Sequence, residues 1–151
     1  DLHRTINGKL SDVHKAIKRV REIRSAVGSA QSRWKDLDTA RTKDVNAIAK
    51  RITDTLSTIE NDLVQTKAKA FQDLLNYPVK LNNKIASLAS VASSADRRPT
   101  KQTYDLFTIL AAEADKRLAA LKDVETVMVD ELNTKVKELD LPAVPRPAEK
   151  K

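Results

Sequence analysis

The chain has 151 residues, which is enough to bury a core without disulfides or a structural metal. It contains no cysteine, so disulfides, thiolate nucleophiles and thiolate metal ligands are excluded, and no apolar run approaches the roughly 20 residues of a membrane span. The net charge is +7, only 3% of the residues are aromatic, and there are two glycines. A composition rich in aliphatic and charged residues with few turn formers favours an all-α fold.

The first predicted helix reaches from the N-terminus to about Leu37. Its apolar residues recur at intervals of four and three, as in a heptad seam: Ile6, Leu10, Val13, Ile17, Val20, Val27 and Trp34. Arg24 and Gln31 occupy two positions of the same seam, and we expect their side chains to lean toward water. Asp38, Thr39 and Thr42 then offer side-chain oxygens that can cap the start of a second helix.

This first helix carries most of the positive charge. Residues 1–35 contain nine basic side chains (Arg4, Lys9, Lys15, Lys18, Arg19, Arg21, Arg24, Arg33, Lys35) and three acidic ones (Asp1, Asp12, Glu22). The candidate basic surface comprises Lys15, Lys18, Arg19, Arg21 and Arg24. It is either a landing surface for nucleic acid, lipid headgroups or an acidic protein, or a solvated helix face. We favour the solvated face, because the stacking aromatics and glycine loops typical of nucleic-acid binding are missing.

Three more helices are predicted. The second carries Val45, Ala49, Ile52, Leu56, Ile59, Leu63, Thr66 and Ala70, is widened by Phe71 and Leu74, and stops before Pro78. The short third helix carries Leu81, Ile85, Leu88, Ala92 and Ala95, and stops before Pro99. Thr100 is placed to cap the fourth, whose seam is Tyr104, Phe107, Ala111, Ala114, Leu118, Leu121, Glu125, Met128, Leu132 and Leu139.

Short turns make sequential helices antiparallel. The sequence therefore predicts an all-α, antiparallel up-down-up-down four-helix bundle with three long helices and one short third helix. The bundle domain should cover residues 1–141. Residues 142–151 contain three prolines, at positions 142, 145 and 147, and should form an extended tail.

Few residues carry chemistry. His3 and His14 are eleven positions apart, about 16 Å along one helix, so they cannot share a metal ion. Glu125 falls at a core position, where a buried carboxylate could act as a base, but pairing with Arg24 or Lys135 is the expectation we favour. We expect no catalytic residues, no metal site and no cofactor.

The densest polar cluster surrounds the second predicted turn and comprises Asn76, Tyr77, Pro78, Asn82 and Asn83. Asn82 and Asn83 begin the third helix, where side-chain amides can bond to exposed backbone groups. Tyr77 and Pro78 would fix a chain reversal. A ligand or docking site is the competing interpretation, since loops often carry function. We favour the structural role.

Several short stretches between Asn76 and Thr100, namely Tyr77-Pro78, Leu81-Asn82-Asn83-Lys84, Ser94-Ala95-Asp96 and Pro99-Thr100, resemble the helical C-terminal region that follows the β-propeller in bacterial sortilin-like, BNR-repeat glycosyl-hydrolase-like proteins. The Arg-Glu-Ile-Arg stretch at 21–24 is comparable, whereas no Ser-x-Asp-x-Gly-x-x-Trp box occurs. The resemblance implies that any glycosidase chemistry belongs to the propeller, and it leaves open an exported parent protein.

These observations lead to an expectation of a non-catalytic accessory domain. Its partner would be the β-propeller of the same parent chain or a second copy of itself. The alternative is binding of an anionic surface or nucleic acid through the basic first helix.

Overall fold

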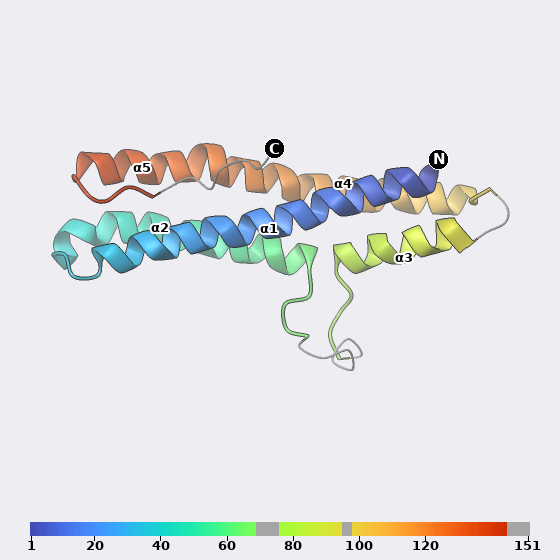
Figure 1. Ribbon diagram of the computed structural model, residues 1–151, viewed down its shortest axis with the longest axis horizontal. Coiled ribbons are helices and arrows are strands. Elements are labelled where there is room, and N and C mark those ends of the chain that lie inside the picture. The colour runs from blue at the N-terminus through green and yellow to red at the C-terminus, as the bar shows by residue number, and fades with distance from the viewer. Residues whose placement is uncertain (69–75, 95–97, 145–151) are drawn as a thin grey trace. The chain divides into compact units, whose positions relative to one another are not determined.

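The computed structural model describes residues 1–68, 76–94 and 98–144. These residues form α1 (Leu2–Trp34), α2 (Thr39–Leu63), α3 (Leu81–Ser94), α4 (Lys101–Asp123), a π-helical turn η2 (Val124–Met128) and α5 (Val129–Glu138), as Figure 1 shows. No strand occurs among the described residues, so the predicted all-α fold class is confirmed. None of the helices in these segments is long and apolar enough to cross a membrane.

Two predicted helix starts are confirmed by their capping bonds. The Asp38 carboxylate accepts a hydrogen bond from the Ala40 amide at 3.0 Å, just before α2. The Thr100 hydroxyl accepts one from the Thr103 amide at 3.4 Å at the start of α4. Each bond satisfies a backbone donor that has no partner within the helix.

The chain divides into two compact units. Unit 1 comprises Asp1–Ile17 and Ile59–Ala119, and unit 2 comprises Lys18–Thr58 and Ala120–Lys151. The helices α1, α2 and α4 each contribute residues to both units.

Unit 2 has a well-filled aliphatic core. Its fully buried members come from the predicted seams of α1 and α2 and from the last helical run: Val20, Val27, Trp34, Val45, Ala49, Ile52, Leu56, Val124, Leu132 and Val136. The segment after α5 also packs onto this core, because Leu141 and Val144 are buried and the Trp34 indole N–H donates to the Pro142 carbonyl at 3.2 Å. Residues 142–144, expected to begin the extended tail, thus cover the indole, whereas 145–151 lie outside the described residues.

Hydrogen bonds between the helices of unit 2 define their directions. Side chains of α1 meet α2 in antiparallel order, with Arg24 bonded to Ser57 and Gln31 bonded to Asn46. The order of contacts between α2 and α5 is also antiparallel, since Arg51 pairs with Glu131 whereas Asp44, earlier in α2, lines a groove with Glu138. Along the chain, the helices of unit 2 therefore alternate in direction as up, down and up, and α1 is parallel to the last helical run. In the predicted bundle of four alternating helices, the first and the last would be antiparallel.

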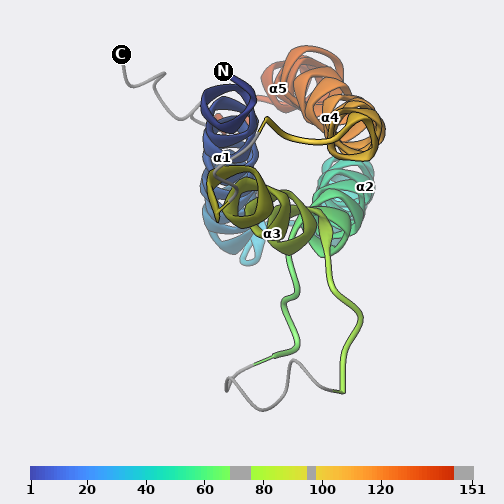
Figure 2. The same ribbon diagram turned by 90° about the vertical axis from the view of Figure 1, so that its right-hand side faces the viewer.

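Unit 1 is built from residues 2–17 of α1, the last turn of α2, α3, and residues 101–119 of α4. Its core includes Ile6, Val13, Leu63, Ile85, Leu110 and Ala114. Lys9 of α1 pairs with Asp115 of α4 at 2.7 Å. In Figures 1 and 2, α3 runs opposite to α1 and α4, in the same direction as the last turn of α2. The chain therefore keeps the same direction in α2 and α3, whereas the predicted turn at Pro78 would have reversed it.

The second helix ends earlier than its seam predicts. It stops at Leu63, although helical periodicity continues to Leu74 in the sequence. Beyond Leu63, the Thr66 hydroxyl bonds to the Asn61 amide oxygen at 2.8 Å, and the Lys67 amide donates to the Gln65 side chain at 3.1 Å. Such local side-chain bonds compete with helical ones. The seam residues Ala70, Phe71 and Leu74 lie outside the described residues.

A π-helical turn interrupts the predicted fourth helix. The buried residues are Leu121, Val124, Val129, Leu132 and Val136, so their spacing is three, five, three and four. A step of five has one residue too many for an α-helical seam, and η2 accommodates it.

The register of the fourth seam also differs at the start of α4. Thr103 and Leu110 are buried, whereas Tyr104, which was expected in the seam, is 47% exposed. The neighbouring seam residues Phe107 and Ala111 are half-buried. The buried face of α4 in unit 1 is therefore rotated by about one residue from the predicted one.

Candidate functional site

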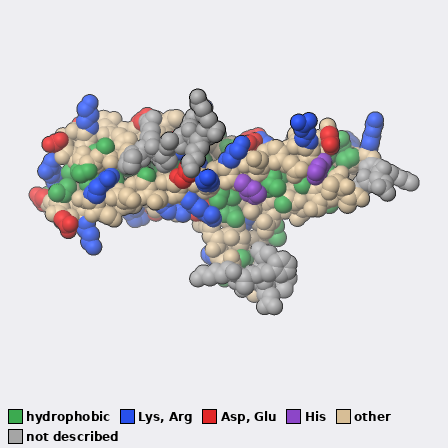
Figure 3. Space-filling model, in the orientation of Figure 1, with side chains coloured by type: hydrophobic (Ala, Val, Ile, Leu, Met, Phe, Trp, Pro, Cys, Tyr) green, Lys and Arg blue, Asp and Glu red, His purple; other side chains and the backbone are tan. Residues whose placement is uncertain are grey.

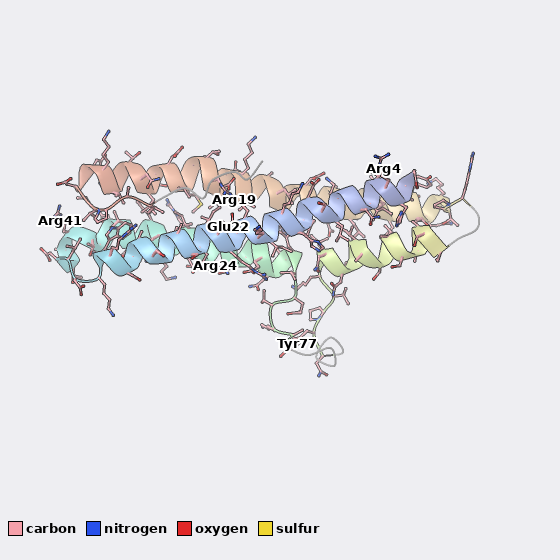
Figure 4. The ribbon with its side chains drawn as sticks, viewed as in Figure 1. Arg4, Arg19, Glu22, Arg24, Arg41 and Tyr77 are labelled. Carbon is pink, nitrogen blue, oxygen red and sulfur yellow. The ribbon has the colours of Figure 1, made fainter. Side chains whose placement is uncertain are left out.

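The candidate basic surface on α1 is only partly free of internal contacts. Lys15, Lys18 and Arg21 are exposed, whereas Arg19 and Arg24 are half-buried. Figure 4 labels Arg19 and Arg24 on the part of α1 that belongs to unit 2, and it shows Arg4 extending away from the helix. Arg19 and Arg24 are thus used within the fold.

Arg19 lies in an ion-pair cluster within unit 2. Its guanidinium pairs with the Glu125 carboxylate and lies 3.6 Å from Glu22 Oε2. Glu125 had been expected to pair with Arg24 or Lys135, but the parallel arrangement of α1 and η2 brings Arg19 to its level. Arg24 Nη2 instead lies 3.4 Å from Ser57 Oγ.

A shallow, solvent-open groove of about 540 Å³ lies between α2 and α5 in unit 2. Its charged residues are mainly acidic: Asp44, Glu131 and Glu138, with Lys135. A hydrogen bond and the negative charge of Glu138 raise the pKa of Lys135 above its usual value. Lys135 therefore neutralises the groove in part and remains protonated at neutral pH.

The two histidines lie apart on α1, both in unit 1, and Figure 3 shows them as separate patches. His3 Nε2 lies 3.2 Å from the Asn7 side-chain amide, and His14 is exposed. In the part of the chain that the structure describes, no three His, Asp or Glu side chains are grouped so that they could hold a metal ion.

The candidate turn is exposed at its tip. Asn76, Tyr77 and Pro78 are exposed, and Figure 4 shows Tyr77 on the connection that stands away from the helices of unit 1. The Gln65 amide donates to the Pro78 carbonyl at 3.0 Å, which joins the two described ends of this connection. Asn82 and Asn83 are half-buried in the first turn of α3, and the Asn82 amide oxygen is buried without a hydrogen-bond partner among the described residues.

A polar hollow of about 340 Å³ lies beside that turn in unit 1. We call it the α3 hollow. Its charged lining is Asp62, Lys80, Lys84, Glu113, Lys116 and Arg117. These residues come from the end of α2, from the start of α3 and its preceding residue, and from α4, which are separated in the sequence but adjacent in unit 1.

The α3 hollow has an excess of positive charge, with four basic and two acidic side chains. Asp62 is engaged by Arg117, whose Nε lies 2.9 Å from Asp62 Oδ2. Among the described residues, Lys80, Lys84 and Lys116 form no ion pair. The hollow is therefore lined by three lysines outside any ion pair in the described segments, with Glu113 as the one acidic residue not engaged by Arg117.

Sequence periodicity did not indicate the α3 hollow, because its lysines lie outside every apolar seam. The only sequence signal was the polar cluster at residues 76–84, which includes Lys80 and Lys84 but not their α4 partners. The buried Glu60 in the last turn of α2, 5% exposed, was also not anticipated.

No family model, no curated protein and no solved structure matches this chain. The resemblance to the helical region after a β-propeller therefore rests on the quoted sequence stretches alone.

Proposed function

We propose that this chain is a non-catalytic helical association domain, and that another polypeptide covers an apolar surface of unit 1. The observation that carries the proposal is the uneven exposure of large apolar side chains. Of the seven that are exposed among the described residues, six belong to unit 1 (Tyr77, Val79, Val91, Tyr104, Leu106, Ile109) and one to unit 2 (Val127).

Three of the six fall on one flank of the α3 and α4 pair. Lys84 and Glu113 line the same hollow, so these two positions lie at the same level of the antiparallel helices. Two turns further along α3 is Val91, and two turns back along α4 is Leu106, with Ile109 one turn from it. Val91, Leu106 and Ile109 are 56%, 47% and 58% exposed, and we call them the α3–α4 apolar surface.

Grouped exposed apolar residues favour a protein interface, whereas single ones are ordinary on any surface. Two occupants are consistent with the sequence: a second copy of the chain, or a β-propeller domain of the same parent protein. The β-propeller as partner rests on the resemblance of residues 76–100 to the helical region that follows such a propeller. A second copy of the chain requires no other protein.

Light scattering during size-exclusion chromatography tests the proposal with a matched pair of variants. The Leu106→Glu/Ile109→Glu variant places charge on the α3–α4 apolar surface, and Val127→Glu places charge on the isolated exposed valine of unit 2. We expect the apparent mass of the wild type and of Val127→Glu to rise with concentration, and the double variant to remain monomeric.

A wild-type chain that stays monomeric at all concentrations would exclude the second copy as the partner. The same variants would then be placed in the full gene-encoded protein, where protection of α3 and α4 from proteolysis should be lost only in the double variant. If neither self-association nor protection depends on Leu106 and Ile109, the proposal fails.

The alternative function, binding of an anionic surface, is favoured by the exposure of Lys15, Lys18 and Arg21 on α1. It has less support than association, since Arg19 and Arg24 make internal contacts. It predicts affinity for duplex DNA or anionic vesicles that falls steeply with salt. Absence of binding at about 50 mM salt, where phosphate contacts are strong, would contradict this alternative function.

A further inference from the structure

We propose that the α3 hollow is a binding site for a phosphate group carried by a small molecule or a lipid headgroup. This inference is independent of the association function, because it rests on the charged lining of the hollow and not on the apolar residues of α3 and α4.

The charge of the lining is the first step. Lys80, Lys84 and Lys116 face one concave volume of about 340 Å³, and none of them has an ion-pair partner among the described residues. With Arg117 and the two acidic residues Asp62 and Glu113, the lining has a formal charge of four minus two, or +2. Basic side chains that line one hollow in excess over acidic ones repel one another, and a bound anion relieves that repulsion.

The fixed position of Arg117 is the second step. Its bond to Asp62 joins α4 to the end of α2 and holds the guanidinium at the wall of the hollow. Arg117 is half-exposed, with 44% of its side chain accessible, so the donors not used by Asp62 remain open to a ligand. Lys80 is half-buried, which limits the freedom of its ammonium group more than that of an exposed lysine.

The third step concerns the kind of anion. A carboxylate carries one negative charge, whereas a phosphate monoester carries about two at neutral pH and presents three acceptor oxygens. The charge of the lining therefore matches a phosphate monoester better than a single carboxylate. Leu81, the first residue of α3, lines the same hollow, and the start of a helix is an environment that favours a bound phosphate.

Size and composition restrict the ligand further. A volume of about 340 Å³ exceeds the volume of an isolated phosphate ion, and Pro78, Val79 and Leu81 supply an apolar section of the lining. The hollow therefore suits a phosphate attached to an organic group, with the phosphate toward the lysines and the organic part toward Pro78 and Val79.

The experiment is a titration of the full chain with inorganic pyrophosphate, followed by backbone amide chemical shifts. We expect saturable shifts at residues 80–84, 116 and 117. The Lys84→Gln/Lys116→Gln variant should bind at least about tenfold more weakly, since it removes two of the four basic side chains of the lining. Both lysines are exposed in the free chain, so the variant should keep the thermal stability of the wild type.

The matched control is Lys43→Gln/Lys137→Gln, which removes the same charge from exposed positions of unit 2. It should retain the wild-type affinity. A second arm replaces pyrophosphate with vesicles of phosphatidate in phosphatidylcholine, and binding only in this arm, lost in Lys84→Gln/Lys116→Gln, would identify a lipid headgroup as the source. If both arms show no binding, or if the control loses as much affinity as the test variant, the proposal is wrong.

Discussion

Unit 2 keeps nearly all of its large apolar side chains inside, whereas unit 1 leaves several of them exposed. In unit 2, Arg19 pairs with Glu125, Arg51 pairs with Glu131, and Val127 is the single large apolar residue that is exposed among the described residues. In unit 1, the α3–α4 apolar surface is open to solvent and three lysines of the α3 hollow lack ion-pair partners in the described segments.

This difference suggests a division of roles, with unit 2 contributing mainly to stability and unit 1 offering surfaces for binding. The buried side chains of unit 2 are used by the fold itself, so substitutions of them should act on the free energy of unfolding. The exposed apolar residues of unit 1 and the lysines of the α3 hollow contribute little to folding and remain available for a partner. The following changes test that division, beginning with the largest expected effect.

Deletion of one residue should abolish cooperative unfolding at one place in unit 2 and leave it intact at another. Deletion of Ser25 turns Val27, Ala30 and Trp34 by about 100° relative to the residues before it, which takes three buried side chains out of the core. The loss of the large side chains Val27 and Trp34 from the core, at about 2 to 5 kcal/mol each, approaches the whole stability of a domain. We expect loss of cooperative unfolding in urea, followed by circular dichroism.

Deletion of Val127 is the matched control, because it removes the extra residue that η2 accommodates. The step from Val124 to Val129 becomes four, an ordinary α-helical interval, and the removed side chain is exposed. We expect cooperative unfolding with a midpoint close to that of the wild type. Equal damage from both deletions would show that the π-helical turn does not absorb the surplus residue.

Truncation of an isoleucine should reduce the free energy of unfolding by several kcal/mol in unit 2 and hardly at all in unit 1. Ile52 is fully buried in unit 2, so Ile52→Ala should reduce the free energy of unfolding by about 2 to 5 kcal/mol. Ile109 in unit 1 is 58% exposed, and Ile109→Ala should change it by no more than about 0.5 kcal/mol. Urea titrations of both variants measure the difference, and comparable losses would contradict the assignment of Ile109 to a free surface.

The smallest effect concerns the exposed groove of unit 2. Glu138 raises the pKa of Lys135 in the folded chain above the ordinary lysine value of 10.5. A raised lysine pKa stabilises the folded state below the unfolded value, and this contribution disappears as the pH rises through the folded value. The melting temperature of the wild type should therefore exceed that of Lys135→Gln by a small amount at neutral pH, and this difference should disappear as the pH rises above 10.5. Lys43→Gln, at an exposed lysine without an ion pair among the described residues, should show no such closing.

The sequence by itself determined the local features of this protein. The seam residues of α1 and α2 from Ile6 to Leu63 are buried or half-buried as their spacing predicts. Asp38 and Thr100 cap the helices that they were expected to cap. These features depend on residues a few positions apart, whose geometry within a helix is the same in any fold.

Only the tertiary structure decided the direction of α3, the π-helical turn and the members of the α3 hollow. The length of the connection after Leu63 allows α3 to resume the direction of α2, and nothing in its periodicity reports direction. Arg19 and Glu125, or Lys84 and Lys116, meet because separate helices pack at a particular level. That level depends on how whole apolar faces fit together, so residues far apart in the chain acquire their shared chemistry only on folding.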